Sequence, residues 1–320
     1  MARGKLALNR RAKDIFARML ENQEQLNIEI HLLDNGSRVL DAGIGVAGSW
    51  EAGKGFAEIC LGGMGTISFQ AMAFGDFWLP GVTVAVDQPV EACLASQYAG
   101  WSVHEGDFFA MGSGPARVLA ATEELFQTIR YREESCCGVL ALEGRTLPSA
   151  QVADYIAKKC SVSPDNLWLI ITPTASLVGS IQVSARVVET GLHKMKELGF
   201  DIHQVKSGWG FCPVAPVAAD DGRALGRTND CVLYGGQVYY TVEADDEEIE
   251  SVVQRMPSSA SADYGTPFYH ILKRYNWDFY QIDPLLFSPA QVVVNNIKSG
   301  KVFQAGGVNK AVLKQSLLGG

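Results

Sequence analysis

The sequence predicts an α/β protein of two domains, each a mixed β-sheet flanked by helices, with a cleft between the domains. In the middle of the chain, short apolar runs alternate with segments of helical period. The flanks are richer in loops and in β-branched and aromatic strand signals. We therefore predict a central α/β domain over residues 86–202 and a discontinuous second domain formed by residues 1–85 and 203–320.

The first predicted element is an amphipathic helix near the N-terminus. Leu8, Ala12, Ile15 and Met19 recur at helical steps, and Asn9 is a possible N-cap. The basic residues of this segment would also suit an organelle-targeting peptide. The helical period favours an ordinary first helix.

The central domain is predicted to contain four strand-helix pairs. Gly100 and Gly199 stand where glycine commonly ends a helix, while Pro115 and Pro148 stand near helix starts. The expected strands are residues 83–87, 101–105, 138–143 and 167–172, and the expected helices are residues 90–99, 115–126, 148–159 and 181–198.

The second domain is predicted from strand signals on both flanks. The acidic run 243–250 indicates a solvated turn and helix start rather than a metal loop. The expected strands of this domain are residues 38–42, 231–242, 291–297 and 301–304.

Composition limits the partners of the protein. A chain of 320 residues with 47% hydrophobic residues can form one large or two modest cores. The net charge of −8 argues against nucleic acid and anionic lipid, and it would favour a cationic substrate. No apolar run approaches the ~20 residues that span a bilayer. We expect a soluble, cytoplasmic protein without a membrane or nucleic-acid partner.

Cysteine and histidine usage predicts no metal site. The seven cysteines form no CxxC pair, and the five histidines form no HxH or HExxH motif. Buried thiols in a reduced cytoplasmic chain are the expected outcome.

A glycine-rich segment at 43–48 matches the spacing of a dinucleotide-binding loop. Gly43, Gly45 and Gly48 follow a strand-like run, as in GxGxxG motifs whose backbone approaches a pyrophosphate. Gly53 and Gly55 are expected to interrupt the helix that such a site needs, and no second strand ending in an acidic residue follows. A turn-rich connection is favoured, with a nicotinamide-dependent oxidoreductase as the alternative.

Two further polar segments are candidate ligand sites. Gly112, Ser113 and Gly114 precede a predicted helix start, whose free N–H groups would suit an anion or a carbonyl, although a tight turn is an equal alternative. Asn229 and Asp230 stand at the entry of a predicted strand, where they would hydrogen-bond a heterocycle or form a turn.

The strongest candidate for chemistry is the pair Arg186 and Glu189. Residues three apart share a helix face, and a carboxylate beside a guanidinium after a strand end is a plausible activator of water. The same spacing extends to His193 and Lys196, which is typical of a solvated helix face, and spacing alone favours that alternative. The preceding loop and helix start carry further polar side chains: Thr172, Thr174, Ser176, Ser180 and Gln182.

Four segments together resemble the N5,N10-methenyltetrahydromethanopterin cyclohydrolase family. They stand in family order and the likeness covers nearly the whole chain: GDFFAMGSGPAR (106–117), TPTASLVGSIQVSARVVET (172–190), GRTNDCVLYGG (226–236) and DFYQIDP (278–284). The resemblance implies hydrolysis of 5,10-methenyltetrahydromethanopterin to the 5-formyl compound, in cytoplasmic one-carbon metabolism during formaldehyde oxidation or methanogenesis. The pterin is then the substrate, and neither a cofactor nor a metal is needed.

The resemblance also implies an assembly and residue roles. The resemblance implies a homotrimer of two-domain subunits, with the substrate pocket between the two domains of each subunit. Glu189 would be the general base, and Arg186 would orient and tune it. A non-catalytic pterin-binding protein is a further alternative. The candidate substrate-binding residues are Gly112, Ser113, Gly114, Thr172, Thr174, Ser176, Ser180, Gln182, Asn229 and Asp230.

Overall fold

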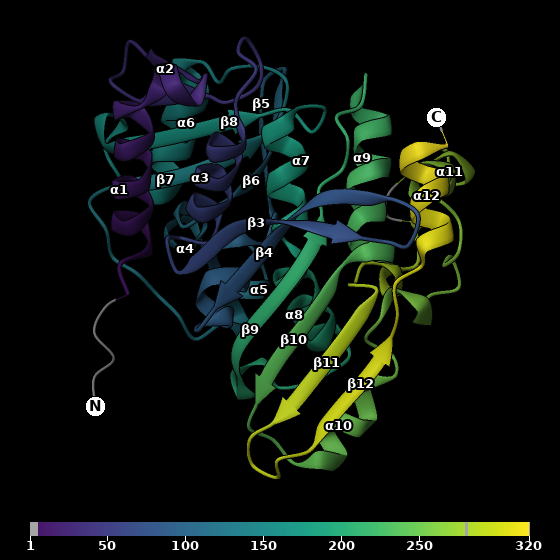
Figure 1. The fold of residues 1–320 in the computed structure, drawn as a ribbon. Coiled ribbons are helices and arrows are strands. Elements are labelled where there is room, and N and C mark those ends of the chain that lie inside the picture. Colours follow the sequence, from purple (N-terminus) through teal and green to yellow (C-terminus); the bar gives the residue numbers. More distant parts are fainter. Residues whose placement is uncertain (1–5, 279–280, 320) are drawn as a thin grey trace. The chain divides into compact units, whose positions relative to one another are not determined.

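The computed structural model describes residues 6–278 and 281–319 (Figure 1). The chain divides into two compact units. Unit 1 comprises Met1–Gly65 and Glu91–Gln182, and unit 2 comprises Thr66–Val90 and Val183–Gly320. The mixed α/β fold class predicted from the sequence is confirmed, since each unit holds a mixed sheet with helices. In this division residues 1–65 belong with the central segment, whereas the sequence pattern placed them in the second domain.

Unit 1 is built on a sheet that, within the described residues, has six strands in the order β1-β2-β8-β7-β6-β5. Its middle strands β2, β8 and β7 are parallel, and the remaining neighbours are antiparallel. The predicted strands 101–105, 138–143 and 167–172 are confirmed. The bounds are β1 Glu29–Leu32, β2 Arg38–Asp41, β5 Trp101–Glu105, β6 Phe108–Ser113, β7 Gly138–Glu143 and β8 Leu167–Thr172.

Helices cover both faces of this sheet, which explains why the middle strands β7 and β8 are almost continuously apolar. Successive strand residues point to opposite faces. Leu140 and Leu169 pack with α6 (Ala150–Cys160), whereas Val139 and Ile170 pack with α1 (Leu8–Glu21) and α3 (Trp50–Cys60). The remaining helices of unit 1 are α2 Gln23–Leu26, the π-helix η1 Val90–Gln97, α4 Ala116–Ala120, α5 Leu125–Thr128 and the start of α7 Leu177–Ser184.

The first helix is confirmed, but its predicted cap is wrong. Helix α1 begins at Leu8, so Asn9 lies inside it and is fully buried. The Glu133 carboxylate instead accepts hydrogen bonds from the backbone N–H groups of Leu8 (2.9 Å) and Asn9 (3.0 Å). The Asn9 side chain accepts from the N–H of Val139 at 3.0 Å. A cap from a residue distant in sequence leaves no local signal at the helix start.

The glycines expected to interrupt a helix lie inside α3. A Cβ added at Gly53 would lie 2.6 Å from Cδ1 of Ile181, and one at Gly55 would lie 2.6 Å from Sδ of Met19. Both glycines therefore allow close packing of α3 against its neighbours. The prediction of a broken helix is wrong because tertiary packing overrides a weak local propensity.

Unit 2 is built on a second sheet, in which the described strands follow the order β12-β11-β10-β9-β4-β3 (Figure 1). The pair β10 and β11 is parallel, while β9 is antiparallel to both β4 and β10. The predicted run 83–87 lies in this sheet and not in the central one, so that assignment is wrong. The bounds are β3 Gly65–Ala73, β4 Trp78–Val86, β9 Val205–Pro213, β10 Gln237–Val242, β11 Gln291–Asn296 and β12 Val302–Gly306.

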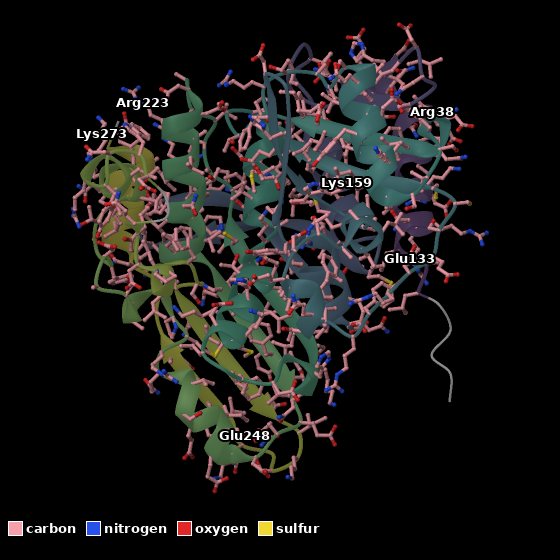
Figure 2. All side chains as sticks on the ribbon, turned by 180° about the vertical axis from the view of Figure 1, so that it is seen from behind. Arg38, Glu133, Lys159, Arg223, Glu248 and Lys273 are labelled. Atoms are coloured by element: carbon pink, nitrogen blue, oxygen red, sulfur yellow. The ribbon has the colours of Figure 1, made fainter. Side chains whose placement is uncertain are left out.

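The predicted strand 231–242 begins only at Gln237. Helix α9 (Asp221–Asp230) continues directly into the π-helix η4 (Cys231–Gly235), so the first apolar residues of the predicted strand are helical. The acidic run is confirmed as a helix start, because it leads into α10 (Asp246–Val253), from which Glu248 points outward (Figure 2). The other helices of unit 2 are α8 Val187–Glu197, α11 Phe268–Arg274 and α12 Lys310–Leu318.

The predicted helix 181–198 is two helices. Helix α7 ends at Ser184 and α8 begins at Val187, with Arg186 as the N-cap residue of α8 (φ −82°, ψ 1°). The Ser184 hydroxyl donates a hydrogen bond to the carbonyl of Pro213 at 2.8 Å. The helical period continues through the break, so it does not reveal the break in the sequence.

We predict that Glu133→Ala destabilises the protein by about 1–3 kcal/mol, because two buried backbone N–H groups of α1 would lose their acceptor. Urea unfolding followed by circular dichroism measures the change. Glu124→Ala, which removes an exposed glutamate of the same unit, should change the free energy of unfolding by less than about 0.5 kcal/mol. Equal stability of the two variants would contradict the assigned cap.

Candidate active site

The carboxyl ends of the parallel strands of unit 1 place polar side chains at one sheet edge. Asp41 ends β2, Glu143 ends β7 and Thr172 ends β8, and the register pairs Glu143 with Thr172. In open α/β sheets, ligands bind at this edge. The loops that leave these strands therefore form the candidate binding region of unit 1.

The backbone N–H groups of the glycine-rich loop after β2 already donate hydrogen bonds to a side chain of the same loop. The Asp41 carboxylate is buried and accepts hydrogen bonds from the N–H groups of Gly43 (2.9 Å), Ile44 (2.7 Å) and Gly45 (2.7 Å). A dinucleotide would need these N–H groups for its pyrophosphate. After α3 the chain enters β3, which belongs to the other sheet, so no βαβ unit forms. A nicotinamide-dependent oxidoreductase is therefore not favoured.

The hydroxyl residues after β8 are buried and bonded to one another. Thr172 Oγ1 and Ser176 Oγ lie 2.8 Å apart, and Ser176 Oγ also accepts from the N–H of Gly179 at 2.8 Å. A Cβ added at Gly43 would lie 2.6 Å from Thr172 Oγ1, so the loop after β2 packs directly on this cluster. Ser180 is 1% exposed on α7. These residues shape the edge of the sheet.

Glu143 joins two of the predicted substrate-binding residues, and sequence reasoning missed it. Thr174 Oγ1 donates to Oε1 of Glu143 at 2.5 Å, and Gln182 Nε2 donates to Oε2 at 2.6 Å. Hydrogen bonds to an ionised carboxylate are shorter and stronger than neutral ones. The available signal was the position of Glu143 as the polar end of an apolar strand.

Arg186 is the N-cap residue of α8 and Glu189 lies on the first turn of this helix, both in unit 2. Glu189 is the third residue of this helix and is 5% exposed. A carboxylate in the first turn interacts favourably with the helix dipole. The alternative of a solvated helix face is wrong for Glu189 and for Gln182, since Gln182 is only 1% exposed. The His193 side chain, farther along α8, is 29% exposed to solvent. A buried acid at this position is a candidate for chemistry.

The loop expected to cradle an anion is mostly strand. Gly112 and Ser113 belong to β6, and the N–H of Gly114, at φ +98°, donates to the carbonyl of Ser96 at 2.8 Å. The expectation of free N–H groups is therefore wrong at Gly114. The fully buried Arg117 of the same motif donates to that carbonyl at 3.0 Å and pairs with Glu123, which stabilises the C-terminal end of η1.

Asn229 and Asp230 lie at the C-terminal end of α9, and not at the entry of a strand. Asn229 Nδ2 donates to the carbonyl of Leu225 at 2.9 Å. The buried Asp230 carboxylate accepts from the N–H of Phe268 at 2.8 Å and from the Ser316 hydroxyl at 2.5 Å. Asp230 thus joins α9 to α11 and α12. Burial raises the pKa of Asp230 to about 7.

Residues 6–278 and 281–319 show neither a metal-binding cluster nor a membrane-spanning helix. No group of three or more histidine, cysteine, aspartate or glutamate side chains gathers there in a way that could hold a metal ion. No helix in this part of the chain is both long and apolar enough to span a membrane.

An α/β fold with polar loops at its strand ends and a buried glutamate on a helix start has the features of an enzyme acting on a polar substrate. The protein family Cyclohydrolase (MCH) matches residues 7–317 of the chain. The chain therefore belongs to this family of cyclohydrolases, which are hydrolases of a cyclic amidine C–N bond.

Three relatives, each named methenyltetrahydromethanopterin cyclohydrolase, show the extent of the likeness. The protein of Methanocaldococcus jannaschii is 47% identical over 317 residues, which cover 98% of each chain. That of Methanothermobacter marburgensis is 46% identical over 97% of this chain and 99% of the relative. That of Methanococcoides burtonii is 42% identical over 97% of this chain and 98% of the relative. The likeness is therefore full-length.

We predict that Asp230→Asn stabilises the protein increasingly as the pH rises from 4 to 8. The folded pKa of Asp230, about 7, lies above the ordinary aspartate value of 3.8, so the native state binds an extra proton between these two pH values. The stability that Asp230 contributes is complete below pH 3.8 and is lost as the pH rises through 7. The variant should gain roughly 2–4 kcal/mol over the wild type across this range.

Urea unfolding at pH 5, 6, 7 and 8 measures this difference. Glu248→Gln, at an exposed position of the same unit, should show a nearly constant difference from the wild type. A pH-independent difference for Asp230→Asn would show that the Asp230 carboxyl is already ionised in the folded protein at pH 5.

Proposed function

We propose that this protein hydrolyses 5,10-methenyltetrahydromethanopterin to 5-formyltetrahydromethanopterin, with water activated by Glu189. The observation that carries the proposal is the full-length identity of 42–47% to relatives named for this substrate. The buried position of Glu189 beside Arg186 supports the roles of these two residues. The substrate is the pterin itself, and the reaction needs neither a cofactor nor a metal.

The chemistry requires a base more than an acid. The methenyl carbon belongs to a delocalised cation and is already electrophilic, so a deprotonated and well-placed water is the missing reactant. Glu189 accepts a proton from the water while the oxygen bonds to the methenyl carbon. Arg186, the residue that precedes α8, orients the carboxylate and keeps it ionised.

The second half of the reaction opens the ring. The bond between the former methenyl carbon and N10 breaks, and N10 receives the proton that Glu189 took from water. The hydroxyl of the adduct loses its own proton to solvent as the formyl C=O forms. One water is consumed and one proton is released, which balances the loss of the substrate's positive charge.

The setting of the reaction is part of the proposal and is supported by family membership alone. It comprises a homotrimer in the cytoplasm that serves one-carbon metabolism, in formaldehyde oxidation or in methanogenesis. The candidate substrate-binding residues keep this role in the proposal, with Thr174 and Gln182 best supported because both bond to Glu143. A non-catalytic pterin-binding protein would bind the substrate and leave its methenyl chromophore intact.

We predict that Glu189→Gln lowers kcat at least 100-fold while the protein stays folded, since an amide cannot accept the proton from water. Loss of the methenyl absorbance measures turnover. Glu197→Gln, at an exposed position on the same helix, should keep activity within about twofold of the wild type. Near-normal turnover by Glu189→Gln would eliminate the general-base role.

We predict that Arg186→Gln lowers kcat and moves the acid limb of its pH profile to higher pH. Without the guanidinium, the charged form of Glu189 loses electrostatic support, so the carboxylate is protonated at higher pH. Stopped-flow measurement of methenyl decay from pH 5 to 9 gives the profile. Lys196→Gln, which removes a partly exposed cation from the same helix, should leave the profile in place. An unchanged acid limb in Arg186→Gln would exclude the tuning role.

A further inference from the structure

The chain connections of unit 1 leave opposite faces of the sheet at the ends of β7 and β8. Helix α6 follows β7, and its Ile156 packs in the same cluster as Leu140 and Leu142. Helix α7 follows β8, and its Val178 packs in the cluster on the other face, with Val139 and Ile170. Two adjacent parallel strands whose connections diverge form a topological switch point, where α/β sheets bind their ligands.

Glu143 occupies this switch point. It is the last residue of β7 and pairs in register with Thr172 of β8. Its side chain is partly exposed, whereas Asp41, at the end of the next parallel strand, is 1% exposed and accepts three backbone N–H groups. Of these two strand-end carboxylates, Glu143 is therefore the one that a ligand can reach.

The Glu143 carboxylate is held in place without being saturated. Each oxygen accepts one hydrogen bond, from Thr174 at 2.5 Å and from Gln182 at 2.6 Å. Both donors are buried, with exposures of 9% and 1%, so they fix the plane of the carboxylate. A carboxylate oxygen has two acceptor sites, so each oxygen keeps one for a ligand.

The charge of Glu143 is also uncompensated within the described part of the chain. No lysine, arginine or histidine there forms an ion pair with it. Glu123, by contrast, lies 2.5 Å from the guanidinium of Arg117. A rigid, unpaired anion at a ligand-binding edge is suited to a ligand that presents two parallel N–H donors.

We propose that Glu143 is a substrate-binding residue that selects the 2-amino-4-oxopyrimidine edge of a pterin. The N3–H and the exocyclic 2-amino group of such a ring form a donor pair that matches the two carboxylate oxygens. The negative charge also favours the cationic substrate. This inference rests on the proposed function and adds a specificity-determining residue to it, while Thr174 and Gln182 position the carboxylate.

Binding of a tetrahydropterin without the one-carbon unit tests the proposal independently of turnover. Isothermal titration compares this ligand with its 2-desamino analogue on the wild type, on Glu143→Gln and on Glu105→Gln. Glu105 is a matched control, since it ends β5 of the same sheet and also accepts from a glutamine amide, that of Gln151 at 3.2 Å. The wild type and Glu105→Gln should bind the aminated ring at least tenfold more tightly than the analogue.

Glu143→Gln should lose most of this discrimination. In turnover, its KM should rise at least tenfold while kcat stays within about threefold of the wild type, because binding is lost and the chemistry is not. Glu143→Asp, which keeps the charge on a shorter side chain, should restore part of the discrimination. Thermal unfolding shows whether each variant is folded. If Glu143→Gln does not fold, Thr174→Val takes its place as the test. This variant keeps the Glu143 charge but removes one of the two hydrogen bonds that hold the carboxylate, so it should weaken binding of the aminated ring.

Three outcomes would overturn the proposal: full discrimination by Glu143→Gln, equal effects of Glu105→Gln and Glu143→Gln, or a fall in kcat at unchanged KM. Failure of the proposed function looks different. In that case the wild type would bind the aminated ring and discriminate against the analogue, and yet leave the methenyl chromophore intact.

Discussion

The candidate site depends on one constraint: the carboxylates at the ends of buried strands need hydrogen-bond donors. A buried carboxylate is costly unless hydrogen-bond donors replace water. Asp41 receives three backbone N–H groups of its own loop, and Glu143 receives a hydroxyl and an amide. These requirements determine the course of the loops after β2 and β8. The polar edge of unit 1 is thus the result of satisfying acids placed at strand ends.

Close packing through glycine is the second constraint, and it acts in both units. In unit 2, a Cβ at Gly208 would lie 2.5 Å from Val188, and one at Gly210 would lie 3.1 Å from Val187. The first turn of α8 can therefore lie directly on β9. The Tyr240 hydroxyl on the neighbouring strand donates to the Val188 carbonyl at 2.6 Å. Together these contacts fix the turn that carries Glu189.

The helices and strands with the clearest local patterns were predictable. The strands at 138–143 and 167–172 are nearly continuous apolar runs, and the strand at 101–105 alternates apolar and polar residues. The helix at 148–159 has a regular period and a proline near its start. The π-helices η1 and η4 were not predictable as such, since their sequences have no distinct pattern. Strand β6 was missed because its glycine and serine, Gly112 and Ser113, are typical of a loop. The first residues of the predicted strand 231–242 are helical because they extend α9.

The sequence by itself determined the α/β class, the family and the residue types at the ends of the parallel strands. These follow from local periodicity and from long motifs, both of which are properties of consecutive residues. The tertiary structure alone decided which residues meet. Glu133 caps a helix that begins 125 residues earlier, and Glu143 joins Thr174 to Gln182. Such contacts arise from the pairing of distant strands and helices, and burial at Glu189 likewise depends on its surroundings in the fold. A solvated polar helix face and a buried carboxylate can therefore have the same spacing in the sequence, and only packing distinguishes them.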